Sequence, residues 1–197
     1  MNNIDWTGNK TSVHAQNSSS NIFDTEREKN DFYATPPRAA EDLLRNYPSI
    51  NNIWECAAGQ GHLAEVFKAQ GKLGRATELY ERGYGETGVD FLKQTESWNG
   101  WIVTNPPFKF AKEFAMKANE LASVGVALFL KIQFLESVKR RELFEKYPPR
   151  YVYVYTKRCP QCALGGDFSK PTGNAVCYAW FVWEKGFLGE PVVRWIN

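Results

Sequence analysis

Residues 124–130 read Val-Gly-Val-Ala-Leu-Phe-Leu, a run without a single polar side chain. A nearly continuous apolar run of this kind is typical of a strand buried on both faces, as the strands of parallel sheets are. The segment before it, residues 109–122, carries Phe110, Phe114 and Leu121 on one side at helical spacing. We therefore expect a sheet that is covered by helices on both faces.

Strands and helices alternate along the rest of the chain. Further strands are expected over residues 52–56, 76–80, 101–104, 151–155 and 175–183, with a short strand or turn over 89–92. Further helices are expected where Ala39, Ala40, Leu43 and Leu44 follow Pro37, from Leu63 to about Gly71, and over 137–144. The alternation predicts an α/β fold with a doubly wound, Rossmann-like sheet that is mostly parallel.

The last two expected strands break this alternation. No helical pattern separates residues 151–155 from residues 175–183, because residues 157–174 form a polar segment containing Gly and Pro. Strands joined without a crossover helix pair antiparallel. We therefore expect these two strands to form an antiparallel hairpin at one end of the sheet.

The length of 197 residues suits one domain of this kind. Residues 1–30 are rich in Asn, Ser, Thr and charge, which predicts a mobile arm, so residues 31–197 are expected to form a single domain without a separate target-recognition domain. The chain has no apolar run long enough to cross a membrane and no signal-peptide pattern, which favours a cytoplasmic protein with free cysteine thiols.

The net charge of +2 is not the strongly basic balance of a dedicated nucleic-acid binder. Basic residues nevertheless concentrate between positions 131 and 170, namely Lys131, Lys139, Arg140, Arg141, Lys146, Arg150, Lys157, Arg158 and Lys170. A basic face of this kind can bind a phosphate backbone. A solvated helix face is an equal alternative for residues 139–146.

Asn105, Pro106, Pro107 and Phe108 directly follow the expected strand 101–104. Each proline fixes φ and removes a backbone donor, so the chain leaves the strand in one stiff, extended shape. The Asn105 side-chain oxygen and the Pro106 carbonyl can both accept hydrogen bonds from one NH2 group, and Phe108 offers a ring face for stacking. The motif predicts a site for a flat heterocyclic amine; a proline-rich turn that merely ends a strand is the alternative.

A tight loop follows the first strand and opens a helix. Its residues are Glu55, Cys56, Ala57, Ala58, Gly59, Gln60 and Gly61. The glycines let the backbone approach a ligand closely, and the absence of a following Lys-Ser/Thr argues against a phosphate-binding P-loop. Glu78, at the end of the second strand, can accept both hydroxyls of a ribose. Asp90 and Phe91 can bind the amino group of an adenine and pack on its ring, although Glu78 as a solvated strand end and Phe91 as a core residue remain alternatives.

In this order the motifs resemble those of class I S-adenosylmethionine-dependent amino-methyltransferases, in which Asn/Asp-Pro-Pro-aromatic is catalytic. Residues 55–61 look like the glycine-rich cofactor motif, Glu78 like the ribose acid, and Asp90 with Phe91 like the adenine-contacting pair. The segment from Asp31 to Pro36 resembles the motif beside the methionine part of the cofactor, which implies cofactor contacts at Tyr33, Ala34, Thr35 and Pro36 as well as Asn105. Cys56 stands where many relatives have proline.

Residues 31–197 as a whole resemble the small N6-adenine DNA methyltransferase-like proteins of bacteriophages and prophages, with segments 83–85, 130–135 and 179–184 adding to the match. The resemblance implies methyl transfer from S-adenosylmethionine to the N6 amine of adenine in DNA. The Asn105 side-chain oxygen and the Pro106 carbonyl would accept hydrogen bonds from the two N–H groups of that amine. No metal or strong general base would be required. RNA adenine, cytosine N4 and protein glutamine remain alternative substrates, and a non-catalytic binding protein is a further alternative.

A base inside a duplex cannot reach such a pocket, so it has to be flipped out or taken from a single strand. Phe108 would stack on the base, and Lys131, Gln133 and Phe134 would line the rest of the pocket; a helix-start cap and a core contact are equally good interpretations of these three residues. Only segment 157–174 and the N-terminal arm are free to recognise a target sequence. A short or relaxed target site, or help from a protein partner or a second copy, is therefore expected.

Deletion of residues 159–173 should weaken DNA binding and spare cofactor binding. Cys159 and Cys162 in that segment form a C-x-x-C pair, which can be half of a zinc site. A second pair is missing, so no metal is predicted.

Overall fold

The computed structural model describes residues 34–157, 168 and 176–196. Within them, one eight-stranded sheet has the order β3-β2-β1-β4-β5-β7-β6-β8. Its strands are β1 (Ile53–Glu55), β2 (Leu73–Glu78), β3 (Glu86–Thr87), β4 (Trp101–Thr104), β5 (Gly125–Lys131), β6 (Tyr151–Tyr155), β7 (Tyr178–Glu184) and β8 (Val192–Ile196). The α-helices are α2 (Pro37–Asn46), α3 (His62–Ala69), α4 (Ala111–Leu121) and α5 (Arg141–Lys146). Short 3₁₀ turns are η1 (Phe91–Lys93), η2 (Phe108–Phe110), η3 (Ile132–Leu135) and η4 (Val138–Arg140).

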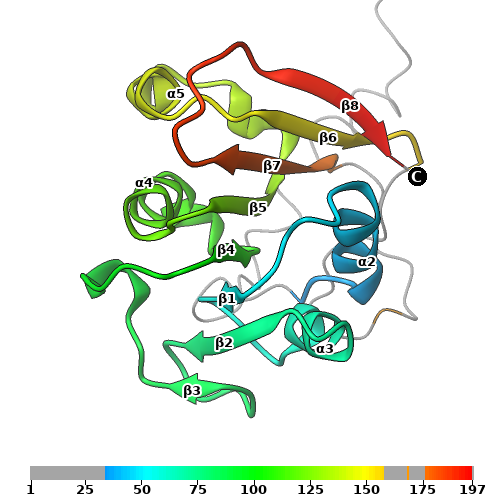
Figure 1. Cartoon of the computed structure of the whole chain (residues 1–197), viewed down its shortest axis with the longest axis vertical. Helices are drawn as coiled ribbons and strands as arrows, with labels where there is room; N and C mark the ends of the chain where they lie inside the picture. Colours follow the sequence, from blue (N-terminus) through cyan, green and yellow to red (C-terminus); the bar gives the residue numbers. More distant parts are fainter. Residues whose placement is uncertain (1–33, 158–167, 169–175, 197) are drawn as a thin grey trace, which may run out of the picture. The chain divides into compact units, whose positions relative to one another are not determined.

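The pairing confirms the predicted doubly wound sheet. Strands β3, β2, β1, β4 and β5 are parallel to one another, while β7 runs antiparallel to both β5 and β6. In Figure 1, α4 and α5 lie on one side of the strands, and α2 and α3 lie on the other. The predicted helices on both faces are therefore confirmed.

The antiparallel hairpin of β6 and β7 is confirmed, but it does not end the sheet. Strand β7 inserts between β5 and β6, and β8, which was not predicted, forms the outer edge parallel to β6. Four of the five residues of β8 are exposed, so this strand lacks the apolar pattern that reveals a buried strand. The short strand or turn expected over 89–92 is the 3₁₀ turn η1, and the helix expected over 137–144 begins as η4 and continues as α5.

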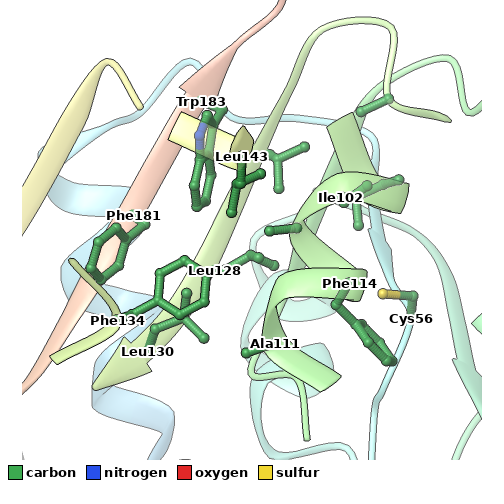
Figure 2. Close-up of a cluster of buried hydrophobic side chains, with 14 of the residues drawn as sticks. Cys56, Ile102, Ala111, Phe114, Leu128, Leu130, Phe134, Leu143, Phe181 and Trp183 are labelled. Atoms are coloured by element: carbon green, nitrogen blue, oxygen red, sulfur yellow. The ribbon is translucent and has the colours of Figure 1, made fainter. Parts of the chain in front are cut away.

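Strand β5 divides its side chains between two hydrophobic cores. Ala127 and Phe129 point to the core beneath α2 and α3, whereas Val126, Leu128 and Leu130 point to the core beneath α4 and α5. Figure 2 shows part of the second core, including Leu128 and Leu130. Each large apolar side chain fully buried here contributes about 1.5–3 kcal/mol to stability. The continuous apolar run in the sequence follows directly from this two-sided burial.

Candidate active site

The carboxyl ends of β1, β2, β4 and β5 meet at one edge of the sheet because these strands are parallel. Ligands of open α/β sheets bind at this edge. The edge brings together the glycine loop after β1, Glu78 at the end of β2, Asn105 after β4, and Lys131 at the end of β5. Tyr178, the first residue of antiparallel β7, lies opposite Lys131.

The glycine loop has a left-handed backbone at two positions, with φ of +57° at Gly59 and +86° at Gly61. Gly61 is the residue from which α3 begins. The loop is fastened to β2 at two points: the backbone N–H of Ala58 donates to the Thr77 carbonyl at 3.0 Å, and that of Gly59 donates to Glu78 Oε2 at 2.8 Å. The loop is therefore held in one shape independently of any ligand.

Tyr84 covers this loop, and the sequence motifs did not identify it as a site residue. A Cβ atom added to Gly61 would lie 2.3 Å from the Tyr84 ring, so only glycine fits beneath it. Burial, together with a hydrogen bond to Glu65, raises the pKa of the Tyr84 phenol above its usual value. Tyr84 is thus held over the start of α3 as a neutral ring.

Glu78, the expected ribose acid, is only 7% exposed, which rules out the solvated strand end. Its Oε2 accepts the Gly59 N–H, and its Oε1 accepts the Leu79 N–H at 3.0 Å and the Tyr80 N–H at 3.3 Å. Arg82 Nε lies 3.8 Å from Oε1. The two oxygens of a carboxylate offer about four lone-pair sites, so these bonds leave capacity for a further donor.

Glu55, at the end of β1, is 2% exposed, and Cys56 beside it is buried in the second core (Figure 2). The backbone N–H of Ala64 in the first turn of α3 donates to the Glu55 carboxylate. Its Oε2 atom is buried and has no hydrogen-bond partner among the described residues. Burial, and secondly the nearby charge of Glu78, raise the pKa of Glu55 well above its usual value. A buried acceptor of this kind fits a cationic or N–H-donating ligand group.

The raised pKa of Glu55 sets a pH dependence of stability. The folded protein keeps a proton on Glu55 at pH values where the unfolded chain, with a pKa near 4.5, has lost it. The stability from this group is therefore full below pH 4.5 and is lost as the pH rises through the raised pKa. Glu55→Gln should flatten this loss in denaturant unfolding measured between pH 5 and pH 8. An unchanged pH profile would show that Glu55 is not the titrating group.

Asp90 and Phe91 differ in how accessible they are. Asp90 accepts the Leu92 N–H at 3.1 Å and pairs with Lys93 at 3.1 Å, and it remains part-exposed. The Phe91 ring is 2% exposed and packs against Trp54 and Phe114 at centroid distances of 5.4 and 5.0 Å. Adenine contact by both residues stays a prediction, and the burial of Phe91 favours its alternative interpretation as a core residue.

Asn105 is oriented from the segment that precedes α2. Its Nδ2 donates to Thr35 Oγ1 at 2.8 Å, and Thr35 is buried. This bond uses one N–H of the amide and orients the group, whose oxygen is the acceptor of the side chain. Pro106 is buried, and the Pro107 carbonyl accepts the Phe110 N–H at 2.9 Å, which closes the turn η2.

Phe108 lies against two residues of the neighbouring strands. Lys131 Nζ is 4.4 Å from the centre of its ring, and the Tyr178 ring is 6.0 Å away. Tyr178 in turn stacks on Phe129 at 5.0 Å with an angle of 7° between the rings. The structure therefore joins Phe108 and Lys131, both expected at the substrate, and adds Tyr178 as an aromatic wall.

Gln133 and Phe134 lie in η3, just beyond Lys131, and have different surroundings. Gln133 is exposed. Phe134 is 6% exposed and packs against Phe144 and Phe181, so its ring is a core contact (Figure 2). Pocket lining by Phe134 was one of two interpretations of the sequence, and this burial favours the other.

Several expected features lie outside the described residues, namely Tyr33, Cys159, Cys162, Arg158, Lys170 and nearly all of the segment proposed for DNA binding. Ala34, Thr35 and Pro36 are described and lead into α2. Among the residues with described positions, no group of three or more His, Cys, Asp or Glu side chains could hold a metal ion. The same part of the chain contains no helix with the length and apolar character needed to cross a membrane.

The sequence matches no protein-family model and no curated protein. Solved structures do match. An inferred class I S-adenosylmethionine-dependent methyltransferase from Listeria monocytogenes has a TM-score of 0.58 and 10% identity, over 93% of this chain and 71% of that one. An inferred RNA methyltransferase from Pyrococcus horikoshii has a TM-score of 0.57 and 17% identity, over 79% and 87%.

The M protein of the type I restriction enzyme EcoKI also matches, with a TM-score of 0.52 and 16% identity, over 86% of this chain and 46% of that one. The chain has the fold of class I S-adenosylmethionine-dependent methyltransferases. At identities of 10–17% the likeness concerns the fold, and the chemistry has to be argued from the site.

Proposed function

We propose that the protein transfers a methyl group from S-adenosylmethionine to the N6 amine of adenine in DNA. The cofactor would lie across the ends of β1 and β2. Its methionine ammonium would face Glu55, its ribose Glu78, and its adenine Asp90. The buried Oε2 of Glu55, which has no hydrogen-bond partner among the described residues, supports this placement. An ammonium beside Glu55 would lower its raised pKa, so that the carboxyl gives up its proton and accepts hydrogen bonds from the ammonium.

The observation that carries the proposal is the fixed amide of Asn105. Thr35 accepts a hydrogen bond from its NH2 group, so the amide oxygen, beside the stiff Pro106–Pro107 turn, would serve as an acceptor for the amine. The lone pair of an aryl amine is delocalised into its ring, which makes it a weak nucleophile. Hydrogen bonds from its two N–H groups to the Asn105 side-chain oxygen and the Pro106 carbonyl would favour a pyramidal nitrogen with a more localised lone pair.

The cofactor supplies an electrophilic methyl group on a sulfonium sulfur. Asn105 and Pro106 would hold the amine nitrogen toward that methyl group, and Phe108 would hold the base by stacking on its ring. As the N–C bond forms and the C–S bond breaks, the amine gains a positive charge, and its proton leaves to water. Positioning of this kind can supply several kcal/mol of the rate enhancement.

A nucleic acid is the preferred substrate class because the solved neighbours include a protein named for RNA methylation and the M protein of a restriction enzyme. Lys131 beside Phe108 supplies a positive charge near the proposed base pocket. The resemblance of the sequence to phage adenine methyltransferases favours DNA over RNA. A protein partner or a second copy remains part of the proposal for target recognition.

Glu55→Gln also tests the proposed contact between Glu55 and the cofactor. Loss of a charge-assisted hydrogen bond costs about 1.5–3 kcal/mol, so we expect S-adenosylmethionine to bind about 10- to 100-fold more weakly. Isothermal titration calorimetry of the wild type and the variant measures this difference. Equal affinity would remove Glu55 from the cofactor site.

The substrate class is tested with S-adenosylmethionine labelled in its methyl group. Equal masses of unmethylated plasmid DNA, total RNA and a protein extract are incubated with the protein and then separated. We expect the label in DNA. Label mainly in RNA or protein would keep the methyltransferase and overturn the proposed substrate.

A further inference from the structure

The segment between β5 and α5 exposes apolar side chains at the substrate edge of the sheet. Val138 is 91% exposed and Leu135 is 46% exposed. Leu135 ends the 3₁₀ turn η3, which follows Lys131 directly, and Val138 begins the next turn, η4. Since Lys131 touches the Phe108 ring at 4.4 Å, this segment begins beside the proposed base pocket.

Arg140 gives the segment a fixed shape. Its Nε donates to the Phe134 carbonyl at 2.7 Å, and its Nη2 donates to the carbonyls of Gln133, at 3.0 Å, and Glu136. Its guanidinium also lies 4.8 Å from the centre of the Phe134 ring, which is anchored in the second core. One side chain thus ties three backbone carbonyls within residues 133–136 together beside the core, and Arg140 is committed to this role rather than to a phosphate.

The tip of the segment, Val138, is apolar and almost fully exposed, and the backbone around it is hydrogen-bonded. Two hydrogen bonds to Ser137 shape the turn η4 that begins at Val138: the Arg140 N–H donates to the Ser137 carbonyl at 3.0 Å, and the Lys139 N–H donates to Ser137 Oγ at 3.1 Å. Val138 packs in neither hydrophobic core. An exposed tip held this firmly fits contact with a partner, because side chains already ordered lose little entropy on binding.

Charge points to a nucleic acid as that partner. The exposed Lys139 follows the tip, and the exposed Lys109 lies in the neighbouring turn η2 after β4. Glu136 is the exposed acid within the segment. Lysines beside an apolar tip match a duplex, in which phosphates flank a stack of apolar base faces.

We propose that Val138, supported by Leu135, enters the base stack of duplex DNA and occupies the space left by the base that moves to Phe108. This inference rests on the proposed function. An apolar side chain inserted between base steps offsets part of the unstacking cost, and the target base must leave the stack before it can react. The tip would therefore be needed for duplex DNA and dispensable for single strands.

The test compares one plasmid in two forms, intact duplex and heat-denatured single strands, so the target sequence need not be known. We expect Val138→Ser to lower the initial rate of methyl transfer to the duplex by about tenfold and to change the rate on single strands by less than about twofold. Val138→Leu should keep the duplex rate. Val138 is almost fully exposed, so these substitutions leave the folded structure intact.

Leu188→Ser is the matched control. Leu188 is 82% exposed but follows Glu184, whose strand β7 ends opposite Gly125 at the far edge of the sheet. It should leave both rates unchanged. Three results would each contradict the insertion of Val138 into the base stack. These are an equal loss of rate on duplex and single strands for Val138→Ser, no loss on the duplex, and a wild type that is active only on single strands. A wild type inactive on both forms would instead overturn the proposed function.

Discussion

Replacing Asn105 with alanine is expected to lower kcat for methyl transfer by about 10²–10³-fold, the usual loss when one preorganised polar group is removed from a reacting centre. The hydrogen bond from the amine N–H to the amide oxygen would become stronger as the nitrogen becomes pyramidal and gains charge in the transition state. The loss should therefore fall on kcat more than on KM. Initial rates with labelled cofactor over a range of DNA concentrations measure this. Full activity in Asn105→Ala would contradict the proposed mechanism.

Thr35→Ala is the graded control for this prediction. It keeps the Asn105 amide but removes the 2.8 Å hydrogen bond that orients it. We expect a fall in kcat of about tenfold, because a loosened group still reaches the amine for part of the time. If Thr35→Ala were as inactive as Asn105→Ala, Thr35 itself would act on the substrate or cofactor.

Gly61→Ala is expected to lower the free energy of unfolding by about 3 kcal/mol and to abolish cofactor binding at ordinary concentrations. Gly61 has φ of +86°, and the new Cβ would meet the Tyr84 ring at 2.3 Å. Relief requires Tyr84 to leave its place over the loop and to give up its bond to Glu65. Denaturant unfolding and calorimetric titration of S-adenosylmethionine measure the two effects.

Gly71→Ala separates the two causes of this loss. Gly71 also has a left-handed backbone, with φ of +64°, but no atom lies within 4 Å of the position a Cβ would take. Gly71→Ala should cost only the backbone strain of about 1–2 kcal/mol and leave cofactor binding unchanged. In a protein that already carries Tyr84→Ala, Gly61→Ala should lower the free energy of unfolding only by the amount expected for Gly71→Ala. Equal losses at Gly61 and Gly71 would show that the Tyr84 contact is immaterial.

The elements whose evidence is local could be predicted from the sequence. The run 124–130 indicated a doubly covered strand because both of its faces are buried, and the turn at Asn105 was indicated because prolines restrict the backbone wherever they occur. Strand β8 was missed because four of its five side chains are exposed at a sheet edge. Edge strands of this kind lack the alternation on which pattern reading depends.

The contacts missing from the sequence interpretation are long-range. Tyr178 meets Phe108 only because β7 runs antiparallel to β5 in one register, and Tyr84 covers Gly61 only because the connection after β2 folds back over α3. Arg140 looked like part of a basic face, whereas its guanidinium binds three backbone carbonyls. Charge counted along a sequence does not distinguish these two uses of an arginine.

Nucleoside mass spectrometry of methylated plasmid DNA tests the central claim most directly. Unmethylated plasmid is incubated with S-adenosylmethionine and either the wild type or Asn105→Ala, then digested to nucleosides. We predict N6-methyladenine from the wild type and about 10²–10³-fold less from Asn105→Ala after the same short incubation at equal cofactor occupancy. A wild type that binds the cofactor but leaves all DNA nucleosides unmodified, or that methylates a carbon atom of a base, would contradict an amine methyltransferase acting on adenine in DNA.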